Sequence, residues 1–265
     1  RISLRENMVK AGLELPLPGP ILENLQKGKN VVYPTNHDRL LCLQNIPGIS
    51  PEKYLKKKAE VACFIGCVAS YYPVTYTIPQ AMLYLLEKAE VDFAFLGQEE
   101  WCCGWPLIGM GREEMVYEFA THNIETVKAM GVKTLVCGCP SCYHVWENLY
   151  PRFSSERELP FEVIHSTDYF LRLLKEGRIP LHSLEAIATY HDPCDLGRAS
   201  GIYESPREII RMVSGMSFVE MRKHGRHATC CGGGGDLEMF FPKISKDIGD
   251  LKIKEIEQTG AEVVL

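Results

Sequence analysis

The chain has 265 residues, a formal net charge of −5, 46% hydrophobic residues and 24% charged residues. These values are typical of a globular protein with one or two domains and a core large enough to fold without disulfides. The acidic balance excludes a generally basic nucleic-acid binder, so no nucleic-acid partner is expected. No run of about 18 apolar residues predicts a membrane-spanning helix.

Cysteine is the most informative residue type in this sequence. The chain has eleven cysteines, an odd number that excludes complete disulfide pairing. Its first residues show no secretory signal, so we expect a cytoplasmic location in which thiols stay reduced. Reduced and clustered cysteines then indicate metal ligands or redox groups.

Regular structure is expected from residue 60 onward, after a lead-in of residues 1–60 in which residues 7–11 form one helical turn. Strands and helices then alternate. The predicted elements are strand 61–65, helix 78–89, strand 91–96, helix 113–130 and strand 132–136. This alternation predicts an α/β fold with a doubly wound parallel sheet. The cysteine-rich turns follow the strands, where such sheets place their sites.

The second half repeats this pattern. Its predicted elements are strand 185–190, helix 206–213, strand 218–221, helix 244–258 and strand 261–265. Cys67 and Cys102 are 35 residues apart, and Cys194 and Cys230 are 36 apart. An internal repeat explains the match. We therefore expect a connector at 1–60, a first domain at 61–180 and a second, pseudo-symmetric domain at 181–265 that ends before its own C-x-x-C.

Five cysteines of the first half follow three predicted strands: Cys67, Cys102, Cys103, Cys139 and Cys142. A zinc ion takes four ligands in a tetrahedron, whereas five cysteines that include an adjacent pair suit a centre with several irons. Two other classes stay open. The protein could be a structural zinc protein, or a metal-free thiol enzyme that uses the C-x-x-C pair.

Other residues near these motifs have simpler interpretations. Cys42, Cys63 and Cys137 lie in apolar runs, so we expect them in the core. Trp101 and Trp105 flank the cysteine pair and are expected to shield it from water.

A glycine-rich loop and a group of tyrosines can each be interpreted in more than one way. The glycine loop 232–235 lacks the lysine of a phosphate-binding loop, so we expect close backbone approach to a cluster or a bound thiol. Tyr71, Tyr72 and Tyr76 line either a partner surface or the packing around the first helix.

The sequence resembles the CCG (cysteine-rich) domain family of heterodisulfide reductases, glycolate and lactate oxidase iron–sulfur subunits, and sulfite-reduction-associated membrane complexes. The motifs that carry the resemblance are Gly66-Cys67, Cys102-Cys103-Gly104, Cys139-Pro140-Ser141-Cys142, Asp192-Pro193-Cys194 and Cys230-Cys231-Gly232. It covers residues 61–265 and implies two pseudo-symmetric Rossmann-like CCG domains with parallel sheets flanked by helices. Many relatives carry a preceding ferredoxin-like segment, which is not present here. Residues 1–60 resemble the connector after it, so we expect the intact protein to be longer at both ends.

The resemblance implies a noncubane [4Fe–4S] cluster bound by Cys67, Cys102, Cys103, Cys139 and Cys142. It also implies a second iron–sulfur centre at Cys194, Cys230 and Cys231 that is incomplete in this chain. The implied activity is reduction of a heterodisulfide-type substrate in two one-electron steps.

Electrons would come from a membrane cytochrome or a flavoprotein, through which the chain would associate with a membrane. The alternative is an electron-transfer subunit of a glycolate- or lactate-type dehydrogenase that feeds quinone. Disulfide reduction also consumes protons, and His165, His191 and His144 are the nearest histidines in sequence. We select His165 and His191 as the catalytic candidates, because His144 has the features of a helix-surface residue.

Overall fold

The computed structural model describes residues 2–13, 21–154 and 156–265. Its internal contacts divide the chain into two compact units, Arg1–Ser166 and Thr167–Leu265. The predicted connector at 1–60 and the predicted boundary between residues 180 and 181 both stay predictions. Among the described residues, no helix is long and apolar enough to cross a membrane.

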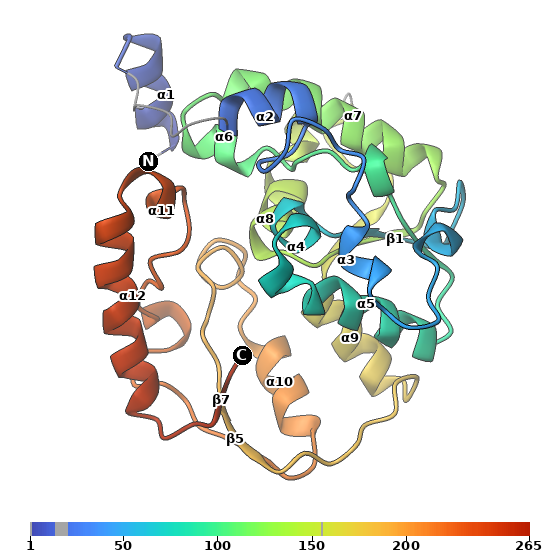
Figure 1. Ribbon diagram of the computed structural model, residues 1–265, viewed down its shortest axis with the longest axis vertical. Helices are drawn as coiled ribbons and strands as arrows, with labels where there is room; N and C mark the ends of the chain where they lie inside the picture. Colours follow the sequence, from blue (N-terminus) through green and yellow to red (C-terminus); the bar gives the residue numbers. More distant parts are fainter. Residues whose placement is uncertain (1, 14–20, 155) are drawn as a thin grey trace. The chain divides into compact units, whose positions relative to one another are not determined.

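The first unit is built on a four-stranded parallel sheet (Figure 1). In the order β2-β1-β3-β4, its strands are β2 (Phe93–Phe95), β1 (Val61–Phe64), β3 (Thr134–Cys137) and β4 (Glu162–His165). The strands β1 and β3 are buried along their whole length, as expected for central strands covered on both faces. The strand β4 was not predicted, because only its last two residues are buried and its apolar signal is correspondingly short.

Helices connect these strands. They are α4 (Cys67–Tyr71), α5 (Thr77–Lys88), α6 (Trp105–Gly109), α7 (Val116–Ala129) and α8 (Pro140–Asn148). The helix predicted at 113–130 is α7 preceded by a 3-10 turn, Glu113–Met115. The helix α7 ends at Ala129, and Gly131, two residues later, adopts a left-handed conformation with φ of 66° and donates its N–H to the carbonyl of Lys128.

The segment before the sheet has more structure than the sequence predicted. It contains α1 (Ile2–Lys10), α2 (Ile21–Gly28), α3 (Leu41–Gln44) and a 3-10 turn at Pro51–Tyr54. The single turn predicted at 7–11 is thus the end of a longer helix. The short helix α3 packs against α4 and α5 of the first unit.

The second unit contains a three-stranded parallel sheet in the order β6-β5-β7. Its strands are β6 (Met216–Phe218), β5 (Ala186–Thr189) and β7 (Val263–Val264), and its helices are α9 (Ser166–Lys175, which begins at the unit boundary), α10 (Glu204–Met212), α11 (Leu237–Phe240) and α12 (Pro242–Glu257). The order β6-β5-β7 repeats β2-β1-β3, which confirms two α/β repeats with parallel sheets flanked by helices (Figure 1).

One predicted strand of this unit was misplaced. The strand expected at 218–221 begins two residues earlier, because Met216 already pairs with Ala186 of β5. Gly215, with φ of 84°, turns the chain into that strand. The core beside it joins Ala188, Tyr190 and Ile210.

Candidate metal centre

Parallel strands bring the cysteine-bearing loops of the first unit to one edge of the sheet. Phe64 of β1 lies opposite Cys137 of β3, so both strands end at the same level. Cys67 starts α4 directly after β1, and Cys142 lies in the first turn of α8 directly after β3. The loop after β2 carries Cys102. The site thus lies where α/β sheets usually carry their ligands.

The thiols of these loops form a continuous chain of contacts. Hydrogen bonds join Cys67 to Cys102, Cys102 to Cys103, Cys103 to Cys142, and Cys142 to Cys139. All but Cys139 are buried. In the part of the chain that the structure describes, no three or more His, Cys, Asp or Glu side chains are arranged to hold a single metal ion.

The hydrogen bonds give four of these thiols unequal acidities. Cys103 accepts hydrogen bonds from Cys102 and Cys142, which lower the pKa of Cys103 to about 6. The pKa of Cys142 is raised well above its usual value, first because it donates to Cys103. The pKa of Cys67 is raised in the same way, first by its hydrogen bond with Cys102 and then by burial. Since the thiolate is the metal-binding form, Cys103 is the ligand that is ready near neutral pH.

Two glycines allow the loops to come together. Gly66 has φ of 85°, and a Cβ at this position would lie 3.0 Å from Sγ of Cys142. Gly104 has φ of 87°, and its Cβ would lie 3.0 Å from Cγ1 of Val116. The N–H of Gly104 is 3.4 Å from Sγ of Cys102, so the same turn also supplies a donor to the sulfur. Glycine is therefore required at both positions for conformation and for space.

The cysteine pair is anchored by side chains from two other elements. Asn123 of α7 accepts the N–H of Trp101 at 3.0 Å and donates to the carbonyl of Cys102 at 3.3 Å. The hydroxyl of Tyr150 donates to the carbonyl of Cys103 at 3.1 Å. Both anchoring side chains are fully buried, so the loop is held in one conformation.

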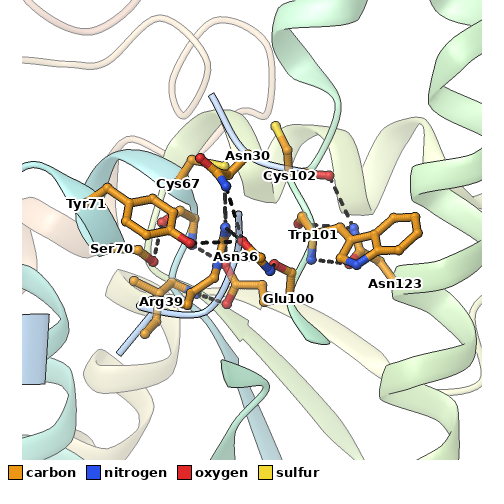
Figure 2. A network of polar contacts seen from close by, with 12 residues as sticks. Asn30, Asn36, Arg39, Cys67, Ser70, Tyr71, Glu100, Trp101, Cys102 and Asn123 are labelled. Atoms are coloured by element: carbon orange, nitrogen blue, oxygen red, sulfur yellow. Dashed lines mark hydrogen bonds and ion pairs between the residues drawn. The ribbon is translucent and has the colours of Figure 1, made fainter. Parts of the chain in front are cut away.

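A buried ion pair lies beside Cys67 (Figure 2). Nη2 of Arg39 is 2.6 Å from Oε1 of Glu100, and both side chains are almost completely buried. Glu100 also accepts the backbone N–H groups of Ile65 at 2.9 Å and Gly66 at 2.7 Å. One carboxylate therefore ties the loop that precedes Cys102 to the residues just before Cys67.

The residues present fit an iron–sulfur cluster. Five thiols come together at one edge of the sheet, Gly66 allows its loop to approach Cys142 closely, and a backbone N–H already points at a ligand sulfur. Backbone N–H groups near thiolates are one of the means by which proteins tune such clusters. Cys67, Cys102, Cys103, Cys139 and Cys142 would hold the cluster.

The two candidate proton donors lie in different units. His165 ends β4, is 4% exposed, and its ring meets the edge of Tyr143. Burial lowers the pKa of His165 to about 4, so the ring is neutral near pH 7. His191 follows β5, and burial followed by the charge of Lys252 lowers its pKa. Their role as proton donors stays a prediction.

The second-unit cysteines repeat the loop geometry but not the burial. Cys194, Cys230 and Cys231 are exposed. The N–H of Gly232 is 3.3 Å from Sγ of Cys230, and Gly232 has φ of 86°. A Cβ there would lie 2.3 Å from the carbonyl oxygen of Ser245 in α12. Gly232, the first glycine of the loop 232–235, therefore allows the loop to approach the backbone of α12 closely. The sequence had instead predicted that this loop approaches a cluster or a bound thiol.

The remaining residues from the sequence analysis are also located. Cys42, Cys63 and Cys137 are fully buried, as expected for core residues. Tyr71 is buried and packs on Arg39. Of the two interpretations of Tyr71, internal packing is therefore correct and a partner surface is not. Trp101 is half-buried and stacks on His122 at 3.7 Å between ring centroids, so its ring is engaged by α7.

Sequence reasoning missed the polar residues that surround the thiols: Asn36, Arg39, Glu100, Asn123 and Tyr150. Glu100 stands two residues before the cysteine pair, and an acidic residue at that place is the one local signal that could have been noticed. Arg39 lies in a polar stretch with no periodicity, so no pattern singles it out.

Several oxidoreductases are similar to this chain in sequence. A component of the dihydromethanophenazine:CoB–CoM heterodisulfide reductase of Methanosarcina acetivorans is 34% identical over 99% of this chain and 63% of its own length. The EtfAB:quinone oxidoreductase of Syntrophomonas wolfei is 32% identical over 79% of this chain and 29% of its own. The probable iron–sulfur-binding oxidoreductase FadF of Bacillus subtilis is 35% identical over 72% and 27%.

The chain thus spans less than two thirds of the length of these relatives. Their names, together with the thiol-rich site, support an iron–sulfur redox subunit. The family model of the cysteine-rich domain matches residues 61–146 and 188–265, which is more than half of the chain and includes the cysteine pairs of both units. The chain therefore belongs to the CCG cysteine-rich domain family.

Proposed function

We propose that the first unit binds a noncubane [4Fe–4S] cluster through Cys67, Cys102, Cys103, Cys139 and Cys142, and that the chain is the disulfide-reducing subunit of a redox complex. The observation that carries the proposal is the chain of contacts among these five thiols at one edge of the sheet. The similarity to a heterodisulfide reductase subunit over nearly the whole chain supports the choice of substrate class.

The proposed reaction takes two electrons and two protons to cleave one S–S bond and release two thiols. The electrons come from a flavoprotein or a membrane cytochrome of the complex. When bound at these cysteines, the cluster would supply an iron that can bind a thiolate and pass electrons one at a time. The protein holds the five ligands and keeps four of them buried from water.

A second function is favoured by a different observation. Similarity to a quinone-linked oxidoreductase over 79% of the chain supports a subunit that passes electrons to quinone without reducing a disulfide. The same five cysteines would hold the cluster in that case. A structural zinc site is the remaining alternative of another class.

The test begins with iron, acid-labile sulfide and zinc in anaerobically purified protein and in two variants. Cys103→Ser removes the thiol at the centre of the contact chain, and Cys231→Ser is the matched change in the second CCG motif. We expect about four irons and four sulfides in the parent and in Cys231→Ser, and almost none in Cys103→Ser. Roughly eight irons in the parent would mean that the second unit also binds a cluster.

Zinc at about one per chain without sulfide would contradict the redox proposal. The two redox functions are separated by a second assay, in which dye-reduced protein receives either a mixed disulfide or a soluble quinone. Reoxidation by the disulfide with release of thiols is the expected result. Reoxidation by quinone alone would favour the electron-transfer function.

A further inference from the structure

We propose that Arg39 is a positioning residue whose fixed positive charge on Cys67 raises the reduction potential of the cluster in the first unit. The inference rests on the proposed function, because it assumes a cluster at these cysteines. It assigns a role to a residue outside both cysteine motifs and outside the two segments that the family model matches.

The contact itself is direct. Nη1 and Nη2 of Arg39 are each 3.7 Å from Sγ of Cys67, so both ends of the guanidinium face the sulfur. The Arg39 side chain is completely buried. In a buried site, where the effective dielectric constant is far below that of water, such a charge acts on its neighbour with little screening.

Other residues fix the guanidinium in this place (Figure 2). Glu100 binds Nη2 at 2.6 Å, Asn36 accepts from Nη1 at 3.2 Å, and the guanidinium carbon lies 5.5 Å from the centre of the Tyr71 ring. The hydroxyl of Tyr71 in turn donates to Oδ1 of Asn36 at 2.9 Å. The charge is therefore held by a connected network.

The two charges of the ion pair do not act equally on the sulfur. The carboxylate of Glu100 is bound through both oxygens, to Arg39 and to the backbone N–H groups of Ile65 and Gly66. The guanidinium is the partner that contacts Sγ of Cys67. A cation and N–H donors at a ligand sulfur stabilise the electron-richer state, so reduction becomes easier.

The second unit offers a matched control. Arg207 binds Asp192 through two hydrogen bonds of 2.7 and 2.8 Å, and both side chains are buried. Asp192 stands two residues before Cys194, yet the groups bound by Arg207 are carboxylates and a carbonyl, not a thiol. Arg207→Gln therefore breaks a similar buried ion pair without touching the first-unit thiols.

The experiment compares the parent with Arg39→Gln, Arg39→Lys and Arg207→Gln. Reductive titration followed by EPR gives the midpoint potential of each. In Arg39→Gln we expect the ratio of reduced to oxidised cluster at a fixed potential to fall by about tenfold, equivalent to 59 mV for one electron. Arg39→Lys keeps the charge and should recover most of the loss, while Arg207→Gln should match the parent.

A parent-like potential in an Arg39→Gln protein with full iron and sulfide would overturn the inference. If that variant does not retain the cluster, a measurement on the parent protein tests the inference instead. With ¹⁵N-labelled arginine, the reduced cluster should show a hyperfine coupling to a guanidinium nitrogen, and absence of the coupling would overturn the proposal. Failure of the proposed cluster binding looks different, because the parent would then contain no iron and sulfide at all, and failure of disulfide reduction alone would appear in the reoxidation assay and leave the potentials unchanged.

Discussion

The two units share a topology and a loop conformation, yet their cysteines lie in opposite environments. The strand orders β2-β1-β3 and β6-β5-β7 are the same. The glycine after each cysteine pair has φ near 87°, and its N–H points at the first sulfur of the pair. However, Cys102 and Cys103 are 2% and 4% exposed, whereas Cys230 and Cys231 are exposed.

Part of the burial of the first-unit cysteines comes from outside the shared motif. In the first unit, the segment before the sheet contributes the carbonyl of Lys29 to the N–H of Cys102 at 2.7 Å and places Arg39 on Cys67. Asn36 of the same segment donates to the carbonyl of Glu100 at 3.0 Å. The CCG motif thus specifies how the loop turns, while burial and charge at the sulfurs depend on residues that the motif does not contain.

The largest expected effect is a difference in thiol labelling between the cysteine pairs of the two units, measured on the metal-free, reduced protein. Under native conditions we expect maleimide to label Cys230 and Cys231 about 100-fold faster than Cys102 and Cys103, because labelling of a buried thiol requires local opening. Peptide mass spectrometry at several times gives the rates. Equal rates would show that the first-unit loops are open without a cluster, and denatured protein, in which all sites should react alike, is the control.

The next prediction concerns the close approach of the first-unit loops. Gly66→Ala adds a Cβ 3.0 Å from Sγ of Cys142 in a left-handed conformation, so we expect it to cost roughly 3 kcal/mol and to lower iron content strongly. Gly48→Ala is the matched control, since Gly48 has φ of 77° with nothing within 4 Å of its Cβ. Denaturant unfolding and iron analysis measure both effects.

The control separates backbone strain from crowding. Gly48→Ala should cost about 1 kcal/mol and leave iron unchanged, since strain is its main effect. If Gly66→Ala keeps the parent's iron and unfolds like Gly48→Ala, the approach of the loop at Gly66 to Cys142 is not needed for the site.

Much of the α/β pattern could be predicted from the sequence because it depends on local signals. The buried run of β1, the helix α5 and the glycine that follows α7 each carry a strong pattern. Nearly equal spacings between cysteines identified the repeat, and the repeated strand order agrees with it. The weak strand β4 and the short helix α3 lacked such patterns and were missed.

The candidate site could be predicted only in part for the same reason. Metal-ligand types and spacings drew attention to the cysteines. The ion pair of Arg39 and Glu100 joins residues 61 positions apart, and its partners are chosen by the three-dimensional packing of the first unit. A polar residue becomes recognisable as part of the site only when its burial is known.

The smallest expected effect concerns His165, whose ring is buried at the end of β4 in the first unit. Its pKa is lowered from 6.5 to about 4, so the unfolded chain binds a proton in this window that the folded chain does not. Stability must therefore fall as the pH drops through 6.5 toward 4. Between pH 8 and pH 5 this group alone should remove about 2 kcal/mol from the free energy of unfolding.

Urea unfolding of metal-free protein at pH 8 and pH 5 checks this prediction, because His165→Asn should lose that part of the pH dependence. Asp and Glu also titrate toward pH 5, so the measured quantity is the difference between variant and parent. His182→Asn, at an exposed position, should keep the parent's pH dependence. A parent-like slope in His165→Asn would mean that the ring is accessible to protons in the folded state. His165 would then be able to cycle a proton near neutral pH, as a direct general acid must.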